Sequence, residues 1–86
     1  MTYYFVLTAD ASHVAKGTFQ ECECLADHLV ASGLFETLYL ARSRAGEPNA
    51  SIIFEFTYGV QKQCRNVRRL SRRVLLQACK NSPFPI

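Results

Sequence analysis

Two segments with alternating side chains, joined by a turn-rich stretch, constrain the fold more than any other feature of this sequence. Residues 36–44 (ETLYLARSR) and 51–58 (SIIFEFTY) both alternate, and AGEPNA lies between them. A period of two is typical of half-buried strands, and a short stretch with Gly, Pro and Asn favours a chain reversal. We therefore expect an antiparallel hairpin whose second strand has one face made of Ile52, Phe54, Phe56 and Tyr58.

The N-terminal part of the chain predicts a strand followed by a helix. Residues 3–9 (YYFVLTA) are aromatic and β-branched without a breaker, which indicates a strand. Thr18 stands three positions before Glu21, the spacing of a capping box, and Gly33 can supply a left-handed stop. We expect a helix over residues 19–32.

The C-terminal part predicts a second, longer helix. Gly59 breaks the preceding strand, and Asn81 with the prolines at 83 and 85 ends the segment, so we expect a helix over residues 60–80. On a wheel of about 100° per residue, its apolar arc holds Val60, Cys64, Val67, Val74, Leu75 and Ala78. The opposite, basic arc holds Lys62, Arg65, Arg69, Arg72 and Arg73, with Arg68 on its flank and Leu76 within it.

The expected order of elements, β-α-β-β-α, indicates an α+β fold, and 86 residues without a repeat fit one domain spanning residues 1–86. A right-handed crossover would make residues 51–58 the central strand of a three-stranded antiparallel sheet, with both helices packed on one face. This order resembles a ferredoxin-like or RNA-recognition-motif fold that lacks its last strand. The expected central strand has no glycine or basic residue, so the resemblance does not imply base stacking.

Charge is divided unevenly along the chain. Residues 1–59 hold three basic and seven acidic side chains, whereas residues 60–86 hold seven basic side chains and no acidic one. Such asymmetry is typical of proteins that bind nucleic acid, a membrane or an acidic protein. Basic neighbours without acidic partners repel each other along a helix, and arginine binds phosphates and carboxylates in a bidentate manner. We therefore expect a partner-binding surface made of Lys62, Arg65, Arg68, Arg69, Arg72, Arg73 and Leu76, the alternative being a solvated helix face.

Two kinds of function fit this surface. The first is a non-enzymatic, protein-binding inhibitor or regulator whose basic helix engages an acidic protein surface. Its small size and two-signed charge resemble those of inhibitors carried by phages and mobile elements, including anti-CRISPR proteins. The alternative is a nucleic-acid-binding protein that makes sequence-independent phosphate contacts through the same helix, although the acids in residues 19–32 would repel a phosphate polymer.

Candidate catalytic and metal-binding groups are sparse. Asp10, Ser12 and His13 occur together in one expected loop, whereas the members of a catalytic triad normally come from separate elements. Cys24 and His28 are four positions apart and could share a metal ion, but Cys22 would point to the other side of the helix. We expect neither an enzyme nor a bound metal or other cofactor.

The N-terminus has no basic segment followed by a long apolar one, and no apolar run is long enough to span a bilayer. We expect a cytoplasmic protein with no membrane partner, whose four cysteines stay reduced.

The expected sheet leaves residues 3–9 as an uncharged edge strand, which would invite pairing with another chain. This favours a homodimer formed through that strand. The alternative is that residues 81–86 fold back, so that Phe84 and Ile86 cover the nearby apolar surface.

Overall fold

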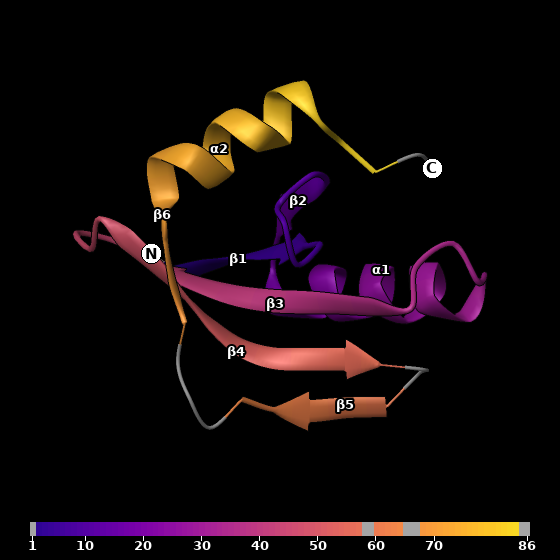
Figure 1. Ribbon diagram of the computed structural model, residues 1–86. Helices are drawn as coiled ribbons and strands as arrows, with labels where there is room; N and C mark the ends of the chain where they lie inside the picture. Colours follow the sequence, from indigo (N-terminus) through magenta and orange to yellow (C-terminus); the bar gives the residue numbers. More distant parts are fainter. Residues whose placement is uncertain (1, 58–59, 65–67, 85–86) are drawn as a thin grey trace.

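The structure is a computed structural model that describes residues 2–57, 60–64 and 68–84. The described residues form one six-stranded sheet and two helices (Figure 1). In chain order these are β1 (Thr2–Leu7), β2 (Val14–Gly17), α1 (Phe19–Ala31), β3 (Thr37–Arg44), β4 (Asn49–Thr57), β5 (Val60–Gln63), β6 (Arg69–Ser71) and α2 (Arg72–Asn81).

The sheet is antiparallel with the strand order β2-β1-β3-β4-β5, and β6 pairs with the first residues of β4. The prediction of three strands with residues 51–58 in the centre is wrong, because β3 lies between β1 and β4. Three strands were missed: β5 and β6, in the segment predicted to be helical, and β2, which turns back onto β1 before α1 begins. β2 and β3 lie on the two sides of β1, so α1 connects β2 to β3 across β1.

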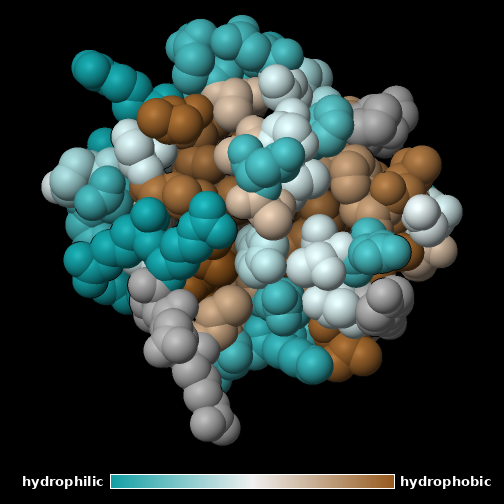
Figure 2. All heavy atoms as spheres, in the orientation of Figure 1, coloured by the Kyte–Doolittle hydropathy of each residue, from teal (hydrophilic) through white to brown (hydrophobic). Residues whose placement is uncertain are grey.

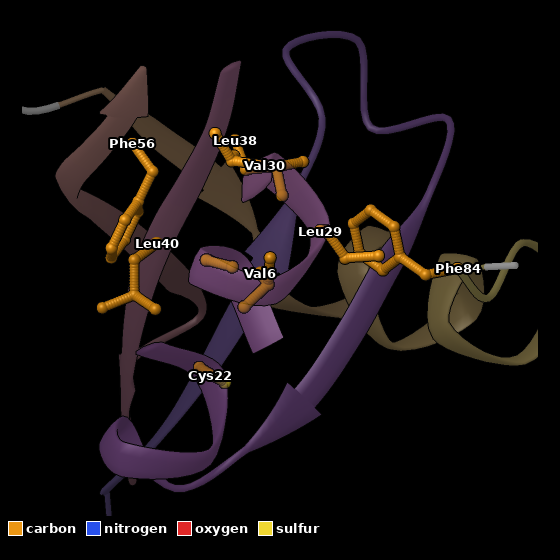
Figure 3. Packing of buried hydrophobic residues seen from close by; sticks show 9 residues of the cluster. Val6, Cys22, Leu29, Val30, Leu38, Leu40, Phe56 and Phe84 are labelled. Atoms are coloured by element: carbon orange, nitrogen blue, oxygen red, sulfur yellow. The ribbon is translucent and has the colours of Figure 1, made fainter. Parts of the chain in front are cut away.

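The two helices lie on opposite faces of the sheet (Figure 1), so the prediction that both pack on one face is also wrong. The α1 side buries Val6, Leu38, Leu40 and Phe56 with residues of that helix (Figure 3). The α2 side buries Phe5, Leu7, Val14, Ala41, Ala50, Ile52 and Leu75. Adjacent residues of β1 thus belong to different cores. A strand that is apolar on both faces needs cover on both.

A β-bulge divides β4 into two halves, and the alternation of side chains between the two faces of the sheet reverses from one half to the other. Leu40 of β3 pairs with Phe54, whereas the next residue, Ala41, pairs with Ile52, so Ile53 is the extra residue. Phe54 therefore packs on the α1 side and Ile52 on the α2 side. The prediction that Ile52 shares a face with Phe54 and Phe56 is wrong, because one inserted residue reverses the alternation beyond it.

The helix predicted over residues 60–80 is wrong in its first half. Residues 60–63 form β5 and residues 69–71 form β6, and the helix begins only at Arg72. A continuous helix would place like charges four residues apart, as at Arg68 and Arg72, whereas β6 separates them. Val60 and Val74, assigned to the apolar arc, are 54% and 58% exposed.

Two local predictions are confirmed. Residues 37–44 and 49–57 form the antiparallel hairpin. The capping box is present at the start of α1, where the Glu21 amide donates to Thr18 Oγ1 at 3.1 Å and the Thr18 amide donates to Glu21 Oε1 at 3.0 Å.

The C-terminal segment crosses the edge of β2 and joins the two sides of the sheet. The Val14 amide donates to the Ser82 carbonyl at 3.0 Å, and His13 Nδ1 donates to the Pro83 carbonyl at 3.2 Å. Phe84 is 6% exposed and lies beside Leu29 of α1 (Figure 3). The fold-back alternative is therefore confirmed for Phe84, whereas Ile86 lies outside the described residues.

The homodimer predicted through residues 3–9 loses its structural basis. β1 is hydrogen-bonded to β2 on one side and to β3 on the other, so it offers no free edge to a second chain. Within the described part of the chain, neither helix is long and apolar enough to cross a membrane.

Candidate binding surface

The residues predicted to form one basic stripe are distributed over three elements. Lys62 belongs to β5, Arg69 to β6, and Arg72 and Arg73 to the first turn of α2. Arg68 directly precedes β6, and its carbonyl accepts from the Ile52 amide at 2.8 Å. Arg65 lies outside the described residues. The prediction that these residues form a single helix face is therefore wrong, although some of them lie near basic residues from elsewhere in the chain.

Lys62 and Arg68 are neighbours of an acidic side chain. Lys62 pairs with Glu55 across β5 and β4, and Glu55 pairs with Tyr39 of β3. Burial raises the pKa of Tyr39, the nearby charge of Glu55 raises it further, and the charge of Arg68 opposes the rise. Because Glu55 adds a negative charge to this part of the sheet, we expect these two basic residues to contribute less to an anion-binding surface than the others do.

Arg69 instead faces a second group of arginines. Tyr4, Arg42, Ser51 and Arg69 form one row across β1, β3, β4 and β6, so they share the α1 side of the sheet. Arg42, Arg44 and Arg69, with Asn49 and Ser51, line an open hollow of about 360 Å³, which we call the arginine hollow. Glu47 is the one acid among the seven described residues that line it. The hollow exists because Ser51, a small residue, stands between two long ones.

The start of α2 adds further positive charge. Arg72 and Arg73 occupy the first turn, which contains no acid, and the Ser71 side chain makes no capping hydrogen bond. Two cations at a helix N-terminus oppose the helix dipole, so this arrangement is unfavourable in the absence of a bound anion. The Arg72 amide donates to the Pro48 carbonyl at 3.0 Å, and its Nη1 donates to the Arg44 carbonyl at 3.4 Å, which fixes α2 against the β3–β4 turn.

A second open hollow of about 590 Å³, the helix hollow, lies along α2. Pro48, Arg72, Arg73, Leu76 and Lys80 line it, with Ser71 and Gln77. Leu76 is half-buried against the core, so it is not the exposed member of a basic arc that the wheel predicted. Figure 2 shows hydrophilic side chains over the part of the surface where β6 and the start of α2 lie, with hydrophobic atoms between them.

A third open hollow of about 430 Å³, the aromatic hollow, lies on the other side of Arg42. Its lining includes Tyr4, Phe19, Phe54 and Gln63. The Phe19 ring contacts the rings of Tyr4 and Phe54 edge to face, with centroids 5.2 Å and 5.9 Å away. Arg42 lines both this hollow and the arginine hollow, and Pro48 lines both the arginine hollow and the helix hollow. The arginine hollow is thus adjacent to each of the other two.

Sequence reasoning missed Arg42 and Arg44, which belong to the acidic part of the chain. Alternation in residues 36–44 does place them on the same strand face. Their meeting with Arg69 depends on the bulge at Ile53 and on β6, and neither leaves a clear local signal.

The residues considered for catalysis are engaged elsewhere. Asp10 Oδ1 accepts from Thr8 Oγ1 at 2.9 Å and from the Ser12 amide at 3.1 Å. The ring of His13 stacks on Phe84, with centroids 5.7 Å apart, and its Nδ1 is bonded to the Pro83 carbonyl. His13 is therefore held by the C-terminal segment and not by Asp10 or Ser12.

The cysteines of α1 differ in environment. Cys24 and His28 are both exposed, whereas Cys22 is buried, and its thiol donates to the Tyr4 carbonyl at 3.5 Å. Burial, and then the charge of Glu21, raises the pKa of Cys22 to about 12. The described residues contain no group of three or more His, Cys, Asp or Glu side chains that could hold a metal ion.

No family model, curated protein or solved structure matches this chain.

Proposed function

We propose that this protein is a non-enzymatic inhibitor or regulator that binds an acidic protein surface through α2. The observation that supports this proposal most directly is the composition of the helix hollow, where Arg72, Arg73 and Lys80 surround the half-buried Leu76. A half-buried aliphatic side chain among cations suits a protein partner that offers apolar contact at the centre and carboxylates around it.

The energetics of α2 also support an acidic partner. Carboxylates of a bound protein would attract Arg72 and Arg73 and would also interact favourably with the positive N-terminal end of the helix dipole, which these two cations destabilise. Arginine is suited to such contacts because its planar fork can hold a carboxylate through two hydrogen bonds.

The regulatory role is proposed from size, charge and the nature of the hollows. None of the three hollows brings a cysteine or serine together with a histidine, as a nucleophile and its base would require. Small binding proteins with a two-signed surface resemble the inhibitors that phages and mobile elements carry, which is the class of protein that we propose.

The alternative ligand of this surface is a nucleic acid held by phosphate contacts along the same helix. In the structure the described basic residues of α2 are Arg72, Arg73 and Lys80, which is a short run for a phosphate backbone. The protein partner therefore fits α2 better, and nucleic acid is the competing outcome of the test below.

The experiment is affinity capture from nuclease-treated lysate with the wild-type protein and two charge-matched variants. R72Q/R73Q removes two charges from α2. K16Q/K62Q removes two exposed charges from β2 and β5, outside all three hollows. We expect the wild type and K16Q/K62Q to retain one acidic protein, which R72Q/R73Q loses, and calorimetry with that purified partner to give the same order.

The thermal midpoints of the three proteins should agree within a few degrees, because the substituted side chains lie outside the buried core. Equal binding by R72Q/R73Q and K16Q/K62Q would exclude α2 as the binding surface. Capture from untreated lysate that is lost after nuclease treatment would replace the protein partner by nucleic acid.

A further inference from the structure

The arginine hollow presents three guanidinium groups to one small area of the sheet. Arg42 and Arg69 are each the register partner of Ser51, from opposite sides, so their Cα atoms are separated by two strand spacings, roughly 10 Å. Arg44 lies two residues further along β3, roughly 7 Å from Arg42. Side chains of this length, extending from three neighbouring positions, can converge on one anionic group above Ser51 and Asn49.

Such a cluster is unfavourable when empty. Like charges gathered on one sheet face repel each other, and the described lining of this hollow includes one carboxylate, Glu47, against three cations. Arginine, serine and asparagine side chains are all hydrogen-bond donors, and together with backbone amides they make most phosphate contacts in nucleic-acid complexes. The chemistry of the lining therefore favours phosphate oxygens.

The neighbouring aromatic hollow indicates what carries the phosphate. It lies directly beside the arginine hollow, with Arg42 common to both, and the seven described residues that line it include three aromatic rings and no acid. Tyr4, Phe19 and Phe54 are each partly exposed. A positively charged groove next to aromatic side chains is the arrangement by which proteins bind single strands, because every base has a face that can stack.

We propose that this end of the sheet binds single-stranded nucleic acid, with backbone phosphates at Arg42, Arg44 and Arg69 and a base in the aromatic hollow. A duplex keeps its bases stacked within the helix and cannot supply one. This site is separate from the α2 surface of the proposed function and does not depend on it.

The test measures the fluorescence anisotropy of a labelled, mixed-sequence single-stranded oligonucleotide titrated with the full-length protein. R42Q/R69Q removes two charges from the hollow, and K16Q/K62Q is its charge-matched control. We expect R42Q/R69Q to weaken binding at least tenfold relative to K16Q/K62Q. The slope of log affinity against log salt should fall by about 0.7 for each phosphate contact that is lost.

Two further variants test the separate parts of the site. E47Q removes the one carboxylate that lines the arginine hollow and should tighten binding. F54L keeps apolar bulk but removes an aromatic face, and it should weaken oligonucleotide binding roughly tenfold while leaving competition by inorganic polyphosphate unchanged. Circular dichroism at the assay temperature shows that each variant is folded.

Several outcomes would overturn the proposal. Equal affinity of R42Q/R69Q and K16Q/K62Q would show that the oligonucleotide responds only to net charge. Tighter binding of a duplex, or equal effects of F54L on oligonucleotide and polyphosphate, would exclude a stacked base. A third outcome combines two results: the wild type does not bind the oligonucleotide, and R42Q/R69Q fails to capture the protein partner. It would assign the arginine hollow to the protein interface instead.

Discussion

Arg42 and Arg69 flank Ser51 in a single row of the sheet, although one belongs to the acidic part of the chain and the other to the basic part. Their approach depends on three features of the tertiary structure. β3 lies next to β4, the bulge at Ile53 turns Ser51 to the α1 side, and β6 pairs with the first residues of β4. The resulting concentration of positive charge supports the proposal that this end of the sheet binds single-stranded nucleic acid.

The repulsion between these two arginines should lower the free energy of unfolding by a measurable amount. We expect Arg69→Gln to raise the free energy of unfolding by up to about 0.5 kcal/mol at low salt, because it removes a like charge two strand spacings from Arg42. The gain should shrink as salt screens the charges. Lys62→Gln should instead lower the free energy of unfolding, because it removes a cation opposite Glu55 on the neighbouring strand. Urea denaturation at low and high salt distinguishes these cases, and equal effects of the two substitutions would contradict the placement of Arg69.

Phe84 should be essential for stability despite its place near the C-terminus. It is 6% exposed and contacts Phe35 edge to face, with ring centroids 5.3 Å apart. Phe84→Ala should therefore cost about 3–5 kcal/mol of unfolding free energy, as expected for a buried aromatic side chain. The control is Leu34→Ala, at a residue that is 59% exposed, which should change stability by less than about 0.5 kcal/mol. Similar midpoints for the two variants would show that the C-terminal segment is not packed.

Ser43 offers a stabilising substitution. Its side chain is fully buried, and its Oγ has no hydrogen-bond partner among the described residues. A buried hydroxyl without a partner loses its hydration without compensation, so Ser43→Ala should raise stability by about 1 kcal/mol. Ser51→Ala, at a partly exposed position, should leave it nearly unchanged. A loss of stability in Ser43→Ala, measured by thermal denaturation, would indicate that the hydroxyl is hydrogen-bonded.

The capping box predicts a component of the acid sensitivity. Hydrogen bonds from the backbone and side chain of Thr18 lower the pKa of Glu21 below its ordinary value of 4.5. A carboxylate whose pKa is lowered in the folded state contributes its full stability above pH 4.5, the ordinary pKa of glutamate. That contribution is lost as the pH falls through the folded-state pKa. Glu21→Gln keeps an oxygen acceptor but does not titrate.

The stability difference between the wild type and Glu21→Gln should therefore narrow as the pH falls below 4.5. Asp10, whose pKa is lowered chiefly by hydrogen bonds with Ser12, acts in the same direction but is common to both proteins. Denaturation curves at a series of pH values check this prediction. A difference that stays constant with pH would exclude a charged capping interaction.

Local signals in the sequence were sufficient for several elements. The capping spacing from Thr18 to Glu21 predicted the start of α1, and alternation on either side of AGEPNA predicted the β3–β4 hairpin. The charge asymmetry identified Arg69, Arg72 and Arg73 as candidate binding residues, and the structure places each of them in the lining of an open hollow. Whether they bind a partner stays a prediction.

The sequence by itself determined which segments are strands or helices wherever hydrogen bonds and side-chain periodicity are local, as in α1 and the β3–β4 hairpin. Only the tertiary structure decided the strand order, the opposite placement of the helices and the division of residues 60–80 into β5, β6 and α2. The basic segment that holds residues 69–71 has a periodicity that suits a helix, but these residues exchange helical backbone hydrogen bonds for pairing with β4, which separates Arg69 from the arginines of α2. The bulge at Ile53 then determines which side chains meet, because one extra residue exchanges the two faces of a strand.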